Sequence, residues 1–290
     1  MKKLISLFLS ILLLLGLSVP AWADNMESCA VIGANLSDEQ VAQVYEYFGI
    51  KRGSVPELTV TNAEERKYLE GLVSEAVIGR NSISCVYVEL LEEGSGIEVS
   101  THNISWCTSD MYKSALETAG ITDARIIVAA PFEVSGTAAL TGVYKAYEHL
   151  TGSELDNEAK QASTEELTIT GELSDLIGSE DAAAVISEVK DILNETGKMS
   201  DDELRAAVKQ IAYDYDLVLN DSELSRIVQW CRKLEKLDIE SIVEQVNQIQ
   251  ETVGKVSKAK DNVVSFAAKV HNFFVTLSGY VNTVKGWFSK

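Results

Sequence analysis

The sequence predicts an α/β (α+β) domain with a mixed sheet, followed by an all-helical region that ends in one long amphipathic helix. Short apolar strand-like runs alternate with capped helical patterns up to about residue 155, and only helical patterns follow from residue 179. A seven-residue apolar repeat then runs from Ile242 to Phe288. Interleaved strands and helices are typical of an α/β or α+β domain, and a sustained heptad pattern is typical of a long helix.

The first 23 residues predict a secretory signal peptide. Lys2 and Lys3 precede the apolar run LISLFLSILLLLGLSV, and Pro20 with the small-residue site AWA follows it. The run is short and poorly flanked for a membrane span, so an uncleaved anchor is only the alternative. We expect cleavage after Ala23 and a secreted or extracytoplasmic mature chain. That chain would carry 23 basic and 44 acidic residues, a formal charge of −21, which disfavours nucleic acid as a partner.

Four strand-like runs belong to the α/β domain, which we assign to residues 24–155. ARIIVAAP lacks polar alternation and is predicted to be the most buried strand, whereas CAVIGA opens the domain. SISCVYVELLEE and IEVSTHNISWC are joined by GSG and predict a central hairpin. In that hairpin Cys85 and Cys107 could face each other, and a disulfide would add about 3 kcal/mol. Two buried free thiols are the alternative that the sequence leaves open.

Helix starts are marked by capping boxes, in which a small polar residue and an acid or amide three positions later satisfy each other's backbone amides. Residues 156–178 are polar and are predicted to form a loosely structured connector, and residues 179–237 form the helical region. The boxes pair Ser37 with Gln40, Thr61 with Glu64, Ser200 with Glu203 and Asn220 with Glu223.

Residues 238–290 predict the long amphipathic helix. From 254 to 290 the chain has six lysines and one acidic residue, net +5, which leaves −26 on the rest of the mature chain. Such a helix could pack on the protein or a second copy, lie on an anionic membrane or wall polymer, or dock on the acidic body of its own chain. The residues expected to contact a membrane are Phe266, Lys269, Phe273, Phe274, Tyr280, Lys285, Trp287 and Phe288.

The turn SGTAALTG, where ARIIVAAPFEV runs into a helix, is the best candidate for a ligand site. Gly136 and Gly142 have five residues between them and no lysine follows, so the phosphate-binding P-loop pattern fails. We expect Ser135 or Thr137 to cap a helix whose small face lies close to the sheet, with an anion held by Ser135, Gly136 and Thr137 as the alternative.

Other catalytic patterns are weak. His102 lies near Cys107 in the sequence, and Ser187 with Lys190 matches S-x-x-K, but neither has a supporting signature. The sequence therefore predicts no catalytic residue, no metal site and no cofactor.

Three blocks resemble the YpuA-like family of secreted proteins of Gram-positive bacteria, a domain of unknown function. They are VIGANLSDEQVAQVYEYFGI, MYKSALETAGITDARIIVAAPFEVSGTAALTGVYKAYE and MSDDELRAAVKQIAYDYDLVLNDSELSRI, in the family's order. The resemblance covers about residues 29–237 and implies export and a cell-envelope setting. It brings no established activity, so no catalytic residue is carried over.

The function predicted is a non-enzymatic envelope protein that associates with a membrane surface or wall through its C-terminal helix. One alternative is an envelope-acting enzyme with a site near the 135–142 turn and His102. The other is an oligomeric scaffold that self-associates through the C-terminal heptads.

Overall fold

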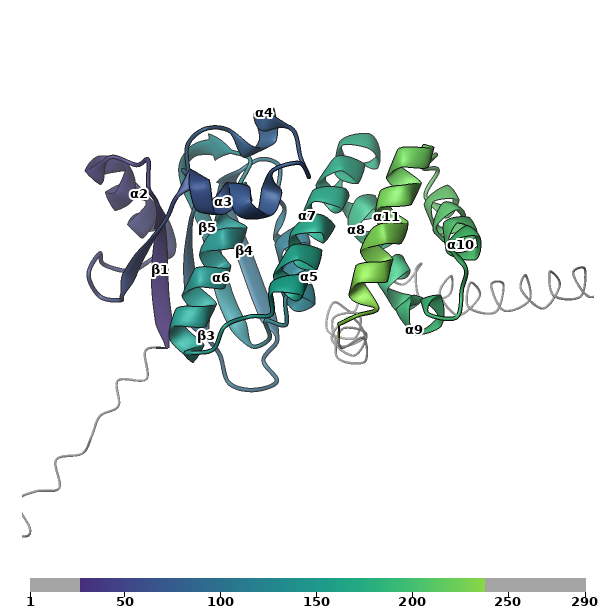
Figure 1. The fold of residues 1–290 in the computed structure, drawn as a ribbon. Coiled ribbons are helices and arrows are strands. Elements are labelled where there is room, and N and C mark those ends of the chain that lie inside the picture. The colour runs from purple at the N-terminus through teal and green to yellow at the C-terminus, as the bar shows by residue number, and fades with distance from the viewer. Residues whose placement is uncertain (1–26, 238–290) are drawn as a thin grey trace, which may run out of the picture.

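The computed structural model describes residues 27–237, which form a five-stranded sheet with helices on both faces and a helical extension at one side (Figure 1). The predicted signal peptide and the C-terminal helix, with all its expected membrane contacts, lie outside the described residues. The strands are β1 (Ser28–Gly33), β2 (Glu57–Val60), β3 (Cys85–Leu90), β4 (Ile97–Ile104) and β5 (Ala124–Val134). The helices are α2 (Asp38–Phe48), α3 (Asn62–Leu69), α4 (Glu75–Ile78), α5 (Ser109–Thr118), α6 (Thr137–Thr151), α7 (Asn157–Ile177), α8 (Ser179–Asp191), α9 (Leu193–Thr196), α10 (Asp201–Asp214) and α11 (Asp221–Leu234).

The sheet is mixed, as predicted, with the order β2-β1-β3-β5-β4. β1 pairs in parallel with β2, β4 pairs in parallel with β5, and the contacts of β3 with β1 and β5 are antiparallel. The predicted central hairpin is wrong, because β5 lies between β3 and β4. β5 is the strand without polar alternation, so an interior position buries more of its apolar surface than an edge would.

The two cysteines of the expected hairpin are therefore not cross-strand neighbours. Cys85 pairs with Ala129 of β5, and Cys107 follows the end of β4. Both thiols are free and buried, as are Cys29 and Cys231. The disulfide prediction fails with the hairpin on which it depended.

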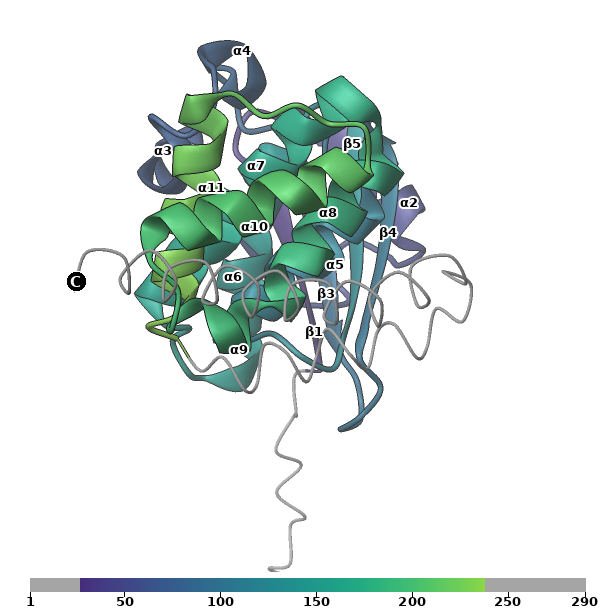
Figure 2. The same ribbon diagram turned by 90° about the vertical axis from the view of Figure 1, so that its right-hand side faces the viewer.

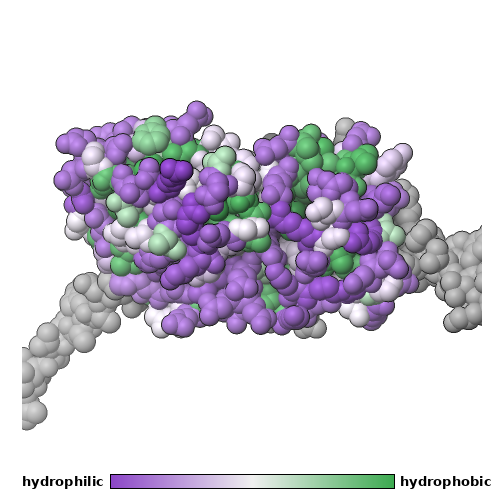
Figure 3. Space-filling view, turned by 45° about the horizontal axis from the view of Figure 1, so that its top comes forward, coloured by the Kyte–Doolittle hydropathy of each residue, from purple (hydrophilic) through white to green (hydrophobic). Residues whose placement is uncertain are grey.

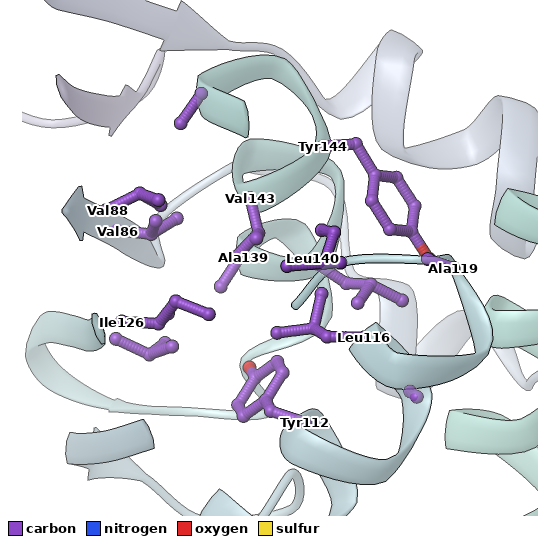
Figure 4. Packing of buried hydrophobic residues seen from close by; sticks show 14 of the residues in the cluster. Val86, Val88, Tyr112, Leu116, Ala119, Ile126, Ala139, Leu140, Val143 and Tyr144 are labelled. Atoms are coloured by element: carbon purple, nitrogen blue, oxygen red, sulfur yellow. The ribbon is translucent and has the colours of Figure 1, made fainter. Parts of the chain in front are cut away.

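Helices α5, α6 and α7 cover one face of the sheet, and α2 covers the other. On the first face, Val86 and Ile126 of the sheet meet Leu140 and Val143 of α6 (Figure 4). Gly142 allows this close approach, because a Cβ there would stand 2.7 Å from Val86 Cγ1. The predicted small helix face against the sheet is confirmed.

Residues 156–178 are not a loose connector, since α7 spans almost all of them as one helix of 21 residues. Its polar residues include buried threonines that bond to the helix itself: Thr170 Oγ1, for example, donates to the Glu166 carbonyl at 2.7 Å. Gly171 lies against the Trp106 indole, and Trp106 Nε1 donates to Asp175 at 3.4 Å. α7 thus joins the sheet to the helical region.

The helical region packs around its own core (Figure 2). α7, α8, α10 and α11 supply most of its buried apolar residues, and the largest is Trp230, whose Nε1 donates to the Ala162 carbonyl at 3.0 Å. All four predicted capping boxes are present, at the starts of α2, α3, α10 and α11.

Candidate functional site

The turn from β5 to α6 is built to hold three elements together. Gly136 is the residue before the helix and has φ 97°, a left-handed conformation that favours glycine. A Cβ on Gly136 would stand 2.5 Å from both Ile104 Cγ2 and the Tyr112 hydroxyl oxygen. Tyr112 of α5 donates its hydroxyl to the Gly136 carbonyl. The glycine thus serves the packing of the turn. The expected capping by Ser135 or Thr137 is wrong, because Gly136 is the N-cap residue of α6 and no side chain caps this helix.

The hydroxyls predicted to hold an anion already have partners within the protein. Thr137 Oγ1 donates to Glu65 Oε1 of α3 at 2.5 Å, and Ser135 Oγ donates to the Val77 carbonyl at 2.8 Å. Glu65 also accepts from Asn62 Nδ2 at 3.1 Å, and it is only 1% exposed. Burial raises the pKa of Glu65 above its ordinary value.

The Glu65 carboxylate lies at the start of α6, where it accepts from the Thr137 hydroxyl. The first turn of a helix favours a negative group, because its backbone amides lack partners within the helix. In this fold the carboxyl bound at the first residue of α6 belongs to Glu65 itself.

His102 lies on the other face of the sheet from this turn. Its ring stacks on Tyr47 of α2, with centroids 5.1 Å apart and planes 11° apart. Asn103 follows at φ 57° in a bulge and donates to the Tyr47 hydroxyl at 3.2 Å. The structure therefore does not bring His102 together with Ser135 or Thr137, which lie on the α6 side.

Cys107 is not positioned as a nucleophile. Its side chain is buried, and burial raises the pKa of the thiol to about 12. A thiol with that pKa is protonated at neutral pH, whereas the reactive form is the thiolate. His102 is exposed on the far side of β4, so the pair has no shared site.

A buried ionic cluster joins α5, α7 and α8. Lys190 Nζ contacts Glu166 Oε1 at 2.8 Å and the Ser114 hydroxyl at 3.1 Å. Ser114 and Thr118 both donate to Glu166. The S-x-x-K match of Ser187 with Lys190, which has no supporting signature in the sequence, does not form a pair: the hydroxyl that Lys190 Nζ contacts is that of Ser114. Lys190 is 0% exposed, so the cluster offers no surface to a substrate.

One sequence signal could have pointed to this cluster. Lys190 follows Ile186 by one helical turn and thus continues the buried face of α8, where an apolar residue is expected. A charged residue in such a position requires a buried partner.

A small groove lies between α7 and α11 in the helical region. Leu176 in this groove is 60% exposed. Arg226 crosses it: its Nη1 donates to Glu172 Oε2 at 2.5 Å, and its Nη2 donates to Thr168 Oγ1 at 2.7 Å. Hydrophobic residues reach the surface on this half of the molecule as well as on the sheet half (Figure 3). The α7–α11 groove is lined by Ile169, Glu172, Leu173, Leu176, Glu223, Arg226 and Ile227.

Comparison with known proteins places the chain in a family. The model described as "Protein of unknown function (DUF1002)" matches residues 32–256. The chain belongs to the DUF1002 family. A relative of known sequence is "Uncharacterized protein YpuA" of Bacillus subtilis (strain 168), 36% identical over 283 residues, which cover 96% of this chain and 97% of the relative. The predicted YpuA-like resemblance is confirmed.

DUF1002 membership supplies no activity, since the family's own description states that its function is unknown. No solved structure matches the chain. Within residues 27–237, no helix is long and apolar enough to cross a membrane.

Proposed function

We propose that this DUF1002 protein is an exported, non-enzymatic protein of the cell envelope that binds an anionic membrane surface through residues 254–290. The separation of charge along the chain is the observation that carries the proposal. Residues 27–237 hold 17 Lys and Arg against 38 Asp and Glu, net −21, whereas residues 254–290 are net +5. A basic amphipathic segment with interspersed aromatics is attracted to anionic lipid, while an acidic body is repelled by it.

The state of the reactive side chains supports a non-enzymatic role. The candidate reactive side chains of the described part of the chain are not free to act on a substrate. Hydrogen bonds to neighbouring groups hold Thr137, Ser135 and Lys190, and Cys107 is buried. Catalysis needs a nucleophile and a base within hydrogen-bond reach of each other and of a substrate. The sequence-predicted candidates do not meet that requirement.

Vesicle co-sedimentation tests the proposal. The mature full-length chain should sediment with phosphatidylglycerol vesicles but not with phosphatidylcholine vesicles, and added salt should weaken the binding. Two variants should lose it: a chain ending at Val253, and one with Lys255, Lys258, Lys260, Lys269, Lys285 and Lys290 changed to Gln. A Lys51→Gln variant is the control on the body.

Equal, weak sedimentation of the full-length and shortened chains would refute membrane attachment. Retention by isolated anionic wall polymer, without vesicle binding, would move the function to the wall. Export is checked separately by intact mass of the protein from the culture, which should begin at Asp24.

A further inference from the structure

The α7–α11 groove is a small apolar surface between two packed helices. It is lined by Ile169, Leu173 and Leu176 of α7 with Ile227 of α11, and Leu176 is the exposed one of the four. Leu176 stands 60% exposed at the edge of a well-packed core. Grooves between two helices are a recurrent binding mode for the apolar face of a third.

The groove is bordered by negative charge. Of its lining residues, Glu172 and Glu223 are acidic, and Arg226 already pairs with Glu172. An occupant with an apolar face and flanking lysines would complement this border.

The chain carries one segment of that chemistry. Residues 254–290 have six lysines, one acid and the apolar heptad pattern described above. α11 forms one wall of the groove. The described part of the chain ends at Leu237, ten positions after the groove residue Ile227. Docking requires the long helix expected over residues 238–290 to break near Gly254. Residues 238–253 then span about 24 Å as a helix and up to about 50 Å when extended, so the segment can return to the groove. A tethered occupant also binds at a high effective concentration.

We infer that the α7–α11 groove is the docking site for residues 254–290 of the same chain. Docking buries the apolar face of that segment and pairs its lysines with the acidic border. Where the proposed membrane binding holds, docking also competes with lipid, so that the segment is released when anionic lipid is present.

Zero-length carbodiimide coupling of the mature full-length chain tests the docking without lipid. This reagent joins a lysine to a carboxylate only when the two are in contact. Mass spectrometry should find tail lysines coupled to the carboxylates that line the groove, Glu172 or Glu223. In a mixture of ¹⁴N and ¹⁵N chains, the coupled peptides should carry one isotope only.

Two variants make the test specific. Leu176→Arg places a positive charge at an exposed groove position and should reduce these couplings at least fivefold. The matched control, Phe132→Arg, changes a 49% exposed residue of β5 in the sheet domain and should leave them unchanged. A tail variant, Phe266→Ser with Phe273→Ser, should reproduce the loss without touching the fold of residues 27–237.

The inference is overturned if the couplings are spread over the whole body or are unchanged in Leu176→Arg. Couplings that join a ¹⁴N peptide to a ¹⁵N peptide would also overturn it, because they show that the tail binds a second copy. With lipid, Leu176→Arg should bind phosphatidylglycerol vesicles roughly fivefold more tightly than the wild type, because no docked state competes. If the wild type and Leu176→Arg both fail to bind vesicles, the membrane proposal fails, and the lipid-free couplings still decide the docking.

Discussion

Lys190 and Glu166 form an ion pair at 2.8 Å in which the two side chains are 0% and 1% exposed. The pair links α8 to α7, and Ser114 and Thr118 of α5 complete its hydrogen bonds. A buried pair of charges is tolerated only when its remaining hydrogen bonds are satisfied. A buried ion pair with two hydroxyl donors therefore connects the sheet domain to the helical region within otherwise apolar packing.

Removal of one partner should unfold this junction. We expect Lys190→Met to lower the free energy of unfolding by about 3–5 kcal/mol, because it leaves the Glu166 charge buried without its cation. Urea denaturation followed by circular dichroism measures the change. The double variant Lys190→Met with Glu166→Leu should recover part of the loss. Arg52→Ala, which breaks two solvent-accessible ion pairs, with Asp38 and Glu57, should leave the midpoint nearly unchanged.

The stability of the protein should depend on the protonation of Glu117. This side chain is buried, and its Oε2 has no hydrogen-bond partner among the described residues. Burial raises the pKa of Glu117 from 4.5 to about 7, although Lys190 and Lys113 oppose the shift. The folded state holds this proton more tightly than the unfolded chain, so it should lose stability as the pH rises from 4.5 through about 7.

The size of this effect is at most roughly 3 kcal/mol. The Glu117→Gln variant cannot ionise at this position, so its stability should fall less steeply over the same pH range. Urea midpoints of the two proteins at several pH values provide the comparison. Parallel pH profiles would show that Glu117 ionises as it does in the unfolded chain.

Gly142 should not tolerate a methyl group. A Cβ at this position would meet Val86 Cγ1 at 2.7 Å, and Val86 is itself fully buried in the sheet. We expect Gly142→Ala to cost about 1–3 kcal/mol through overpacking, despite the better helix propensity of alanine. Gly197→Ala is the matched control, because Gly197 has φ −60° and open space around its Cβ position. The control should keep or slightly raise the melting temperature.

The Thr137 hydroxyl should matter as a structural donor. Thr137→Val leaves Glu65 Oε1 without this hydrogen bond and should cost about 1–3 kcal/mol, whereas Thr137→Ser should keep most of the stability. Thermal unfolding measures both. Inorganic phosphate should not raise the melting temperature of the wild type. A rise that Thr137→Val abolishes would instead indicate an anion site.

All four cysteines should be free. Cys29, Cys85, Cys107 and Cys231 are buried thiols in the structure. A thiol reagent should therefore react slowly with the folded mature chain and titrate four thiols after denaturation without a reductant. A titration of only two thiols would instead show that the other two cysteines form a disulfide.

The sequence by itself determined the local features of this protein. Each of the four capping boxes joins residues three positions apart, so a short pattern specifies the start of its helix. The unbroken apolar run of β5 likewise indicated an interior strand, and three ordered blocks indicated the family. These signals are readable because the interacting groups are neighbours along the chain.

Only the tertiary structure decided the strand order, the role of α7 and the fate of the candidate site. Thr137 meets Glu65 across 72 positions, and Lys190 meets Glu166 across 24. The insertion of β5 between β3 and β4 likewise depends on which faces can be buried together. Such pairings are set by the packing of whole helices and strands. A buried charge or hydroxyl needs a partner to offset its loss of water, and the tertiary structure determines which group is near enough to be that partner.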